Sequence, residues 1–237
     1  LNSLPSPWFF SRYGLFLSMI HLNEVRATVK QGVELVAVSK FHPAALIKEA
    51  YDQGQRIFGE SRVQELQAKH EALPADIQWH FIGHLQPNKV KYIAPYISLI
   101  HAVDSYKLLA EINKQAAKHD RVIPCLLELH IAQEDSKYGF TPEACTALLE
   151  DGAWRALKNV QIAGLMCMAS NTPDMVQVRS EFHQARVYFD ELKQRFFADD
   201  PHFCERSWGM SHDYDVAMDE GATLVRVGTA IFGEREY

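Results

Sequence analysis

Lys40 is the first residue of this sequence that could do chemistry, because it ends an apolar run in the segment AVSK. Lysine is rarely buried without a partner, so a lysine that finishes an apolar strand needs an explanation. One explanation is a loop lysine whose ammonium group reaches solvent. The other is an amine that desolvation favours in its neutral, nucleophilic form, so that it can condense with an aldehyde.

Two turns near the end of the sequence could bind a phosphate group. The apolar run 224–227 is followed by Gly228 and Thr229, which would present backbone N–H groups and a hydroxyl at the start of a helix. The segment GMS at 209–211 follows another such run and adds the hydroxyl of Ser211. Each could equally be an ordinary capped turn, but both lie where a barrel enzyme usually binds phosphate.

Arg226 lies two residues before Gly228, so the two residues share one face of the expected strand. An arginine that points into a barrel needs a partner, because buried charges are paired. An acidic strand residue such as Glu128 could form an ion pair with it. A bound ligand is the alternative, and the residues alone leave both open.

Other reactive residue types are arranged less specifically. His80 and His84, in WHFIGH, are four residues apart, but on a strand and turn this spacing does not bring them to one metal ion as it would on a helix. The segment Ser211–Asp213 contains the residue types of a catalytic triad, yet adjacent residues cannot adopt the spatial relay of a triad. We therefore expect neither a metal site nor a serine hydrolase.

These residues must be positioned by an alternation of apolar runs and amphipathic stretches that begins near Val33. The runs expected to be strands are 34–38, 56–58, 78–82, 98–102, 123–131, 160–166, 206–210 and 224–227. The helices with the clearest signals are expected from Pro43 to Gly54, from Thr141 onward, over 174–197, and over 213–220 before Gly221. The runs are continuously apolar, which is typical of parallel strands covered on both faces.

About eight such units in 237 residues predict a single (β/α)8 barrel, a fold of typically ~250 residues. An open doubly wound sheet is the alternative, but its first turn is normally rich in glycine, and the turn here is SKFHP. We expect the barrel to span 23–237, with 1–22 as an extension of no assigned function. Active sites lie at the carboxyl ends of barrel strands, and Lys137 is expected at the lip of that mouth.

The composition excludes several classes of protein. Hydrophobic residues make up 47% and charged residues 23%, which excludes disorder, collagen and coiled coil as the main architecture. The net charge of −6 provides no basic surface for nucleic acid. The apolar run 13–22 is too short to span a bilayer and lacks the features of a secretory signal. Four widely spaced cysteines predict buried free thiols in a reducing cytoplasm.

An aldehyde-reactive lysine, a phosphate turn and an interior arginine together suggest pyridoxal 5′-phosphate (PLP). From about Asn23 to Tyr237 the sequence resembles the PLP homeostasis proteins, also called the YggS or PROSC family. The blocks that carry this resemblance are AVSK (37–40), FGES (58–61), WHFIGHLQPNK (79–89), HAVDS (101–105), EDSKYG (134–139), GLM (164–166), GMSHD (209–213) and VRVGTAIFG (225–233).

The resemblance implies a single barrel of the alanine-racemase N-terminal kind (fold type III) that holds PLP as an internal aldimine on Lys40. In that family's arrangement the phosphate would be held by the two turns described above, and Arg226 would face the pyridine nitrogen. The residues implied for cofactor binding are Lys40, Ser61, His80, Met166, Met210, Ser211, Arg226, Gly228 and Thr229. Ser61 stands where the family usually has Asn, and a serine is shorter and lacks the two amide donors.

The resemblance also implies a carrier or buffer of PLP in vitamin B6 homeostasis, rather than an enzyme. PLP acts as an electron sink when its ring nitrogen is protonated, and an arginine, which does not give up its own proton, would keep that nitrogen unprotonated. Related racemases add a second domain that supplies a base, and none is expected after Gly233. The alternatives are a PLP-dependent amino-acid racemase of low activity and a lysine-dependent aldolase acting on a sugar phosphate.

The expected partners follow from the same resemblance. They are PLP itself and, beyond it, apo forms of PLP-dependent enzymes or free amino acids. Neither nucleic acid nor a membrane is expected as a partner. The protein is expected to be a monomer or a weak homodimer.

Overall fold

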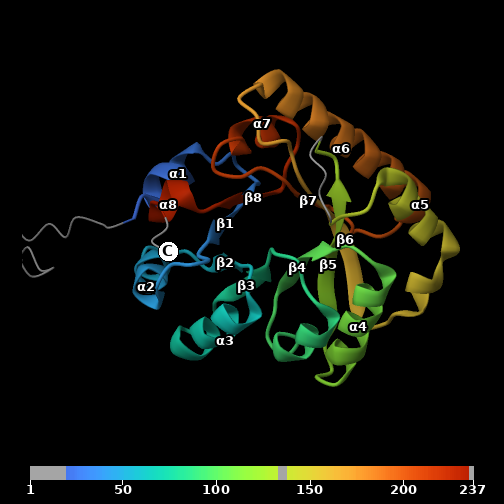
Figure 1. Ribbon diagram of the computed structural model, residues 1–237, viewed down its shortest axis with the longest axis horizontal. Coiled ribbons are helices and arrows are strands. Elements are labelled where there is room, and N and C mark those ends of the chain that lie inside the picture. The colour runs from blue at the N-terminus through green and yellow to red at the C-terminus, as the bar shows by residue number, and fades with distance from the viewer. Residues whose placement is uncertain (1–19, 133–137, 235–237) are drawn as a thin grey trace, which may run out of the picture.

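Eight parallel strands pair in chain order, and β1 also pairs with β8, so the sheet closes into a barrel (Figure 1). This computed structural model describes residues 20–132 and 138–234. The strands are Glu34–Val38 (β1), Ile57–Glu60 (β2), Gln78–Phe81 (β3), Leu99–Val103 (β4), Ile123–His130 (β5), Val160–Met168 (β6), Glu205–Ser207 (β7) and Leu224–Val227 (β8). The predicted (β/α)8 barrel is confirmed, and the alternative of an open sheet is wrong.

Helices lie between the strands and cover the outside of the barrel (Figure 1). The α-helices are Leu22–Thr28 (α1), Ala44–Asp52 (α2), Val63–Ala72 (α3), Tyr106–Ala117 (α4), Pro142–Asp151 (α5), Met175–Phe196 (α6), Tyr214–Asp219 (α7) and Thr229–Phe232 (α8). Two 3-10 helices, Pro87–Tyr92 (η1) and Ala153–Ala156 (η2), complete the connections. Lys137, which was expected at the lip of the barrel, lies outside the described residues.

Side-chain caps explain where two of the predicted helices begin. The hydroxyl of Thr141 accepts a hydrogen bond from the N–H of Ala144, and Pro142 occupies the first helical position of α5. The carboxylate of Asp174 accepts from the N–H groups of Val176 and Gln177 and so caps α6. The local signals in the sequence therefore locate these helix starts to within one residue.

Strand β7 is shorter than predicted, because the chain turns at Gly209. The strand covers Glu205–Ser207, whereas 206–210 was expected. Gly209 has a φ of +91°, and a Cβ atom there would lie 2.6 Å from that of Ala217. The residues from Trp208 to Met210 consequently form a loop at the carboxyl end of the barrel.

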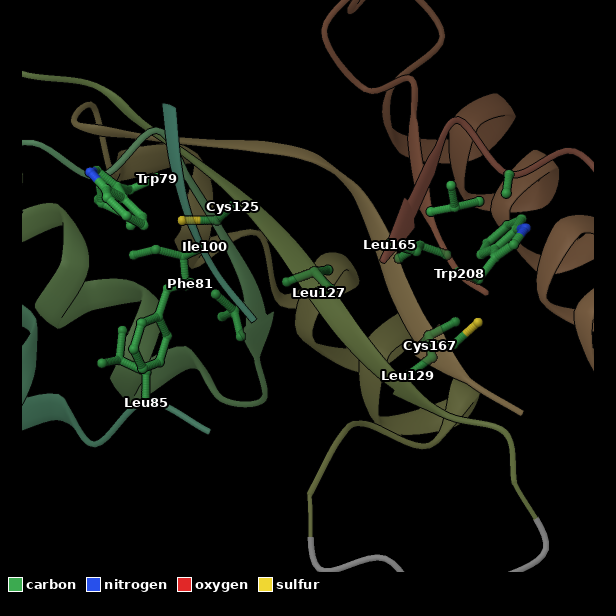
Figure 2. Packing of buried hydrophobic residues seen from close by; sticks show 14 of the residues in the cluster. Trp79, Phe81, Leu85, Ile100, Cys125, Leu127, Leu129, Leu165, Cys167 and Trp208 are labelled. Atoms are coloured by element: carbon green, nitrogen blue, oxygen red, sulfur yellow. The ribbon is translucent and has the colours of Figure 1, made fainter. Parts of the chain in front are cut away.

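The core has two parts, which are separated by the sheet itself. A small cluster fills the barrel interior and includes Val36, Leu126 and Met166. A much larger cluster packs the outer face of the sheet against the helices, and Figure 2 shows part of it, with Leu127 and Leu129 of β5 near Leu165 of β6. Alternation along each strand sends neighbouring residues to opposite faces. The side chains at positions such as 126 and 128 therefore face inward.

The two ends of the described chain meet beside the barrel. The N–H of His21 donates to the carbonyl of Ile231 at 2.8 Å, and α1 lies next to α8 (Figure 1). Ile20 and Leu22, which precede the expected start of the barrel domain at 23, are buried in the core. Residues 1–19, the rest of the expected extension, lie outside the described residues.

The cysteines are free, but one of them is not buried. Cys125, Cys145 and Cys167 lie in the interior, as predicted, whereas Cys204 is exposed. Cys204 immediately precedes β7, and its backbone N–H bonds to the sheet while its thiol points toward the carboxylate of Glu205 on the surface. In the two described ranges, no helix is both long enough and apolar enough to cross a membrane.

Candidate functional site

Strands β1 and β8 bring the first and last chemical candidates of the sequence side by side. Their register pairs Val36 with Arg226 and Ala37 with Val227. Lys40 follows the carboxyl end of β1, and Gly228 follows the carboxyl end of β8. Residues separated by almost the whole chain therefore lie on adjacent strands at the same mouth of the barrel.

The turn after β8 packs closely on β1 at a glycine. A Cβ atom at Gly228 would lie 3.1 Å from the carbonyl oxygen of Val38. The N–H of Gly228 donates to the hydroxyl oxygen of Ser211 at 3.2 Å, which joins the β7 and β8 loops. Because that oxygen is the acceptor, the hydroxyl hydrogen of Ser211 remains available to a ligand.

The first turn of α8 adds further donors next to Ser211. Among the described residues we find no hydrogen-bond partner for the backbone N–H of Thr229 or of Ala230. The Thr229 side chain is exposed, and its hydroxyl belongs to the same turn. This donor set of N–H and O–H groups, on a backbone without a Cβ atom at position 228, is chemically suited to an anionic group such as a phosphate.

A buried carboxylate holds the shape of the β7 loop. Asp213 is fully buried, and it accepts a hydrogen bond of 2.6 Å from the N–H of Met210. Burial raises the pKa of Asp213 above the ordinary aspartate value. The carbonyl of Gly209 accepts from the N–H of Arg226, so this loop is also tied to β8. Both predicted loop residues, Met210 and Ser211, are thereby held at the mouth.

Arg226 is 4% exposed and lies inside the barrel. It donates to the carbonyl and the hydroxyl of Ser207, both at 2.6 Å, and to the carbonyl of Cys167 at 3.0 Å. A guanidinium has five N–H groups, so these three bonds leave two that the described residues do not satisfy. No described carboxylate lies within ion-pair distance, and the ion pair with Glu128 considered above is therefore not formed.

A chain of hydrogen bonds continues from Arg226 across the interior. The hydroxyl of Ser207 lies 2.8 Å from Nδ1 of His101, and Nε2 of His101 lies 3.0 Å from Nδ1 of His80. Burial lowers the pKa of His80 to about 3. Burial also lowers the pKa of His101 well below its usual value, and the charges of His80 and Arg226 add to this effect. Both imidazoles are therefore neutral at physiological pH.

Arg226 favours one direction for the protons along this chain. Arg226 can only donate, so Ser207 accepts from it, and the single hydrogen of the Ser207 hydroxyl is satisfied when it is donated to Nδ1 of His101. His101 then carries its proton on Nε2 and donates to Nδ1 of His80. His80 is left with its own proton on Nε2, which makes it a donor with a defined tautomer.

Two other predicted residues line the interior and its mouth. Ser61 directly follows β2, and a Cβ atom at Gly83 would lie 2.7 Å from that of Ser61, so the turn after β3 packs on it. Met166 of β6 is 1% exposed and belongs to the interior cluster, where the register pairs it with Glu128 of β5. The predicted residues thus come from β1, β2, β3, β6, β7 and β8 or from the turns that follow them.

The side of the barrel that contains β4 and β5 is acidic. Burial, with the charge of Asp104 nearby, raises the pKa of Glu128 to about 7, and Oε2 of Glu128 has no hydrogen-bond partner among the described residues. Asp104 pairs with Nδ1 of His84 at 3.3 Å, and the imidazole of His84 stacks on Tyr138. The described residues contain no group of three His, Cys, Asp or Glu side chains arranged as metal ligands.

The interior chain contains two residues that the sequence did not point to. His101 is only the first residue of the HAVDS block, to which no individual role was assigned, and Ser207 was not singled out at all. They are 106 positions apart, and only the closure of the barrel brings them into contact. The one local signal for Ser207 is a polar residue on the inward face of a short strand.

Comparison with known proteins agrees with the barrel fold. A family model described as the alanine racemase N-terminal domain matches residues 20–236. A pyridoxal phosphate homeostasis protein of Aquifex aeolicus is 42% identical over 205 residues, which cover 86% of this chain and 88% of that protein. The Escherichia coli K12 protein of the same name is 35% identical over 209 residues, covering 86% and 87% of the two chains.

Solved structures lead to the same group. PipY of Synechococcus elongatus, solved with PLP bound, superposes with a TM-score of 0.81 at 39% identity, covering 90% of this chain and 98% of PipY. An alanine racemase of Streptomyces coelicolor superposes with a TM-score of 0.67 at 16% identity, covering 88% of this chain and 56% of that enzyme, and so shares the fold. The chain therefore belongs to the pyridoxal phosphate homeostasis protein family, whose members are built on the alanine racemase N-terminal barrel.

Proposed function

We propose that this protein binds PLP at the mouth of its barrel, as an aldimine with Lys40, and serves cytoplasmic PLP homeostasis as a carrier or buffer with little turnover. One observation carries the proposal. A buried arginine, with two N–H groups that the described residues do not satisfy, lies two residues before a turn whose N–H and O–H donors suit a phosphate, on the strand next to the one that leads to Lys40. The names of the relatives and the PLP bound to PipY support the same conclusion.

The donor groups of the site match the parts of PLP. The hydroxyl of Ser211 and the turn at Gly228 and Thr229 would take the phosphate, which accepts hydrogen bonds only. The remaining N–H groups of Arg226 would donate to the pyridine nitrogen. Lys40, at the carboxyl end of β1, would supply the amine for the aldehyde.

The residues around Arg226 oppose carbanion chemistry. When bound, PLP supplies an aldehyde that condenses reversibly with amines and a ring that withdraws electrons once its nitrogen is protonated. Arg226 would occupy that nitrogen as a donor, and His80 and His101, as neutral imidazoles, are too weakly acidic to protonate it at physiological pH. The ring nitrogen would therefore remain unprotonated, which favours holding the cofactor over turning over an amino acid.

A PLP-dependent racemase of low activity is the second candidate, because one group in the barrel could act as a base. Glu128 faces the interior, its pKa is raised to about 7 by burial, and one of its oxygens has no partner. A carboxylate that exchanges its proton near neutral pH is suited to general acid–base catalysis. Racemisation of an amino-acid panel by the PLP-loaded protein would decide in favour of this candidate.

A trapping experiment tests the proposal directly. The purified apoprotein is titrated with PLP, reduced with borohydride and mapped by peptide mass spectrometry. We expect a visible absorption band and a phosphopyridoxyl group on Lys40, both of which should be lost in Lys40→Ala without loss of the fold. A group that maps mainly to Lys89 or Lys137 would contradict the assignment.

The carrier role has its own measurement. Holoprotein is mixed with the apo form of a PLP-dependent enzyme across a dialysis membrane and, separately, in one solution. Recovery of enzyme activity in both arrangements would show that the bound PLP can be given up, and faster recovery in one solution would indicate direct transfer. Retention of PLP in both arrangements would rule out a carrier.

A further inference from the structure

A buried cluster of charges lies directly behind the turn that contains Lys40. Its centre is Lys69 of α3, whose side chain is 7% exposed. The Lys69 ammonium donates to the carbonyl of Ser39 at 2.7 Å, to Oε1 of Glu60 at 2.7 Å and to Oε1 of Glu65 at 2.6 Å. An ammonium has three N–H groups, so all of its donors are used by this cluster.

The same two carboxylates also hold the residues on either side of Lys40. The hydroxyl of Ser39 donates to Oε1 of Glu60 at 2.6 Å, and the backbone N–H of Phe41 donates to Oε1 of Glu65 at 2.6 Å. The residue before Lys40 and the residue after it are therefore both fixed to one cluster.

Two features of this turn are energetically unfavourable: the backbone conformation of Phe41 and the burial of the Lys69 charge behind it. Phe41 has a φ of +68°, a left-handed conformation that a non-glycine residue rarely adopts. Burial of a charged group is unfavourable until its partners compensate. The hydrogen bonds to Ser39 and Phe41 compensate for these two features and hold the backbone of the turn in one conformation. Lys40 is the residue at the centre of that turn.

We propose that Lys69 is the positioning residue for Lys40, and that its ammonium fixes the turn 39–41 so that the Lys40 amine is presented to the barrel mouth. This inference rests on the proposed role of Lys40. It assigns no contact between Lys69 and a ligand, because Lys69 acts from the outer side of the sheet through Ser39, Glu60 and Glu65.

The test compares Lys69→Met with Lys48→Met. Methionine keeps most of the length of lysine and removes all three hydrogen bonds, whereas Lys48 is an exposed lysine of α2 that pairs with Asp52 and serves as the control. In the apoproteins, reductive methylation followed by peptide mapping measures the reactivity of Lys40 relative to the other lysines. With PLP added, titration gives the affinity, and visible circular dichroism reports whether the cofactor is held in one orientation.

We expect Lys69→Met to lower the affinity for PLP roughly tenfold or more, since hydrogen bonds from a charged group are lost. It should also change the methylation of Lys40 in the apoprotein and weaken the circular dichroism of the bound cofactor. Lys48→Met should match the wild type in all three measurements. A role confined to stability would lower the melting temperature and leave the Lys40 reactivity and the cofactor signal of the folded protein unchanged, which would overturn the inference.

A charge-balanced variant keeps the test decisive if the single variant does not fold. Lys69→Met combined with Glu60→Gln removes one positive and one negative group, while Glu65 still accepts from the N–H of Phe41. The same loss of Lys40 presentation is expected, and wild-type behaviour of this variant would again overturn the inference. If the wild type itself forms no adduct at Lys40, the proposed function fails, and the apoprotein measurement still judges the role of Lys69.

Discussion

Arg226 is a buried cation whose described partners are all neutral, namely two backbone carbonyls and one hydroxyl. Desolvation lowers the pKa of its guanidinium, but an arginine stays charged under all conditions in which the protein is folded. The barrel therefore holds a positive charge with no direct ion pair, and two donors that the described residues do not satisfy, at one point of its interior. This arrangement prepares the site for an acceptor that the protein chain does not itself provide.

The phosphate turn can be tested one hydroxyl at a time. Ser211→Ala and Thr229→Val should each weaken PLP binding roughly tenfold or more, because a hydrogen bond to a charged group contributes about 1.5–3 kcal/mol. Absorbance titration of the purified variants measures the effect, with pyridoxal, which has no phosphate, as the matched ligand. Equal affinity of the wild type for PLP and pyridoxal would refute the phosphate site.

Replacement of Arg226 should change the chemistry more than the binding. Arg226→Glu places a carboxylate where the ring nitrogen is expected, which favours protonation of that nitrogen, so exchange of the α-proton of L-alanine in heavy water should increase. Deuterium uptake is followed by NMR together with chiral analysis, and Arg226→Gln is the neutral control. No increase, with PLP still bound, would show that the arginine is not what limits catalysis. Rapid exchange with racemisation in the wild type would favour the racemase.

Glu128 should make the barrel less stable as the pH rises. Its pKa is 4.5 in the unfolded chain and about 7 in the fold because of desolvation, so the folded state retains its proton over this range and loses relative stability from about pH 4.5 to 7. Glu128→Gln should remove this dependence and stabilise the apoprotein at pH 8 by up to roughly 3 kcal/mol. Urea unfolding at pH 4.5 and pH 8 gives the comparison. An equal effect of the substitution at the two pH values would contradict the prediction.

At the scale of the elements, the hydrogen-bonded chain from Arg226 to His80 connects four strands, β8, β7, β4 and β3. Ser207 is the link that both donates and accepts, so the tautomers of His101 and His80 depend on it. Strand β7 has only three residues, and Ser207 is its last. The side-chain hydrogen bonds of Ser207 therefore add to the few backbone contacts that connect this short strand to the rest of the barrel.

Nitrogen-15 NMR of the histidine rings can test the direction of this chain. We expect both His80 and His101 to be neutral at physiological pH, with the proton on Nε2 of each. Ser207→Ala should disturb the tautomer of His101 and lower the free energy of unfolding by about 1–3 kcal/mol, since it leaves buried polar groups unpaired. A proton found on Nδ1 of His101 in the wild type would show that the direction is wrong.

The elements could be predicted from sequence wherever the pattern is local. Apolar runs bounded by turn residues located the strands, and caps such as Thr141 and Asp174 located two helix starts. The end of β7 could not be located, because the turn at Gly209 is required by the approach of Ala217 from α7.

Residues of the candidate site could likewise be predicted only where their signal in the sequence is local. Lys40, Arg226 and Gly228 are visible as unusual residues at strand ends. The pairing of Ser207 with His101, and the position of Lys69 behind Lys40, arise only when distant strands and helices pack together. Lys69 also lies on a helix in which charged residues are common, so its burial has no signature in the sequence.

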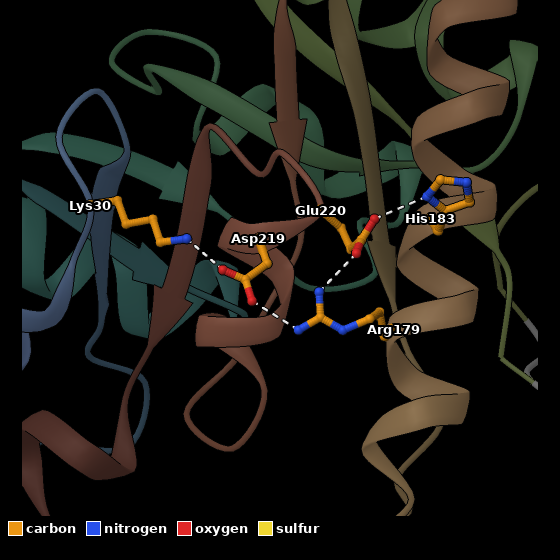
Figure 3. Close-up of polar contacts among 5 residues, drawn as sticks. All are labelled: Lys30, Arg179, His183, Asp219 and Glu220. Atoms are coloured by element: carbon orange, nitrogen blue, oxygen red, sulfur yellow. Dashed lines mark hydrogen bonds and ion pairs between the residues drawn. The ribbon is translucent and has the colours of Figure 1, made fainter.

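At the scale of the whole molecule, a surface network ties the barrel's outer elements together (Figure 3). Asp219 of α7 bonds to Lys30, in the loop before β1, and to Arg179 of α6, and Glu220 bonds to Arg179 and His183. The contacts with Arg179 and Lys30 lower the pKa of Asp219 to about 2. The network thus connects the loop before β1 with helices α6 and α7.

Acid titration should reveal this network. A carboxylate with a lowered pKa stabilises the fold above its unfolded pKa of about 3.8, and this contribution is lost as the pH falls toward 2. Between pH 5 and pH 2 the wild type should therefore lose more stability than Asp219→Asn, and added salt should reduce the difference because the groups are at the surface. Thermal unfolding over this range measures both effects. Parallel curves for the two proteins would count against the network.

The closure of the barrel between β1 and β8 also sets the order in which the proposed site can form. During synthesis Lys40 leaves the ribosome well before Arg226, Gly228 and Thr229, which lie in β8 and the turn after it. A nascent chain therefore carries the Lys40 amine long before it has the turn that we propose for the phosphate. The proposed site is complete only when β8 is inserted beside β1.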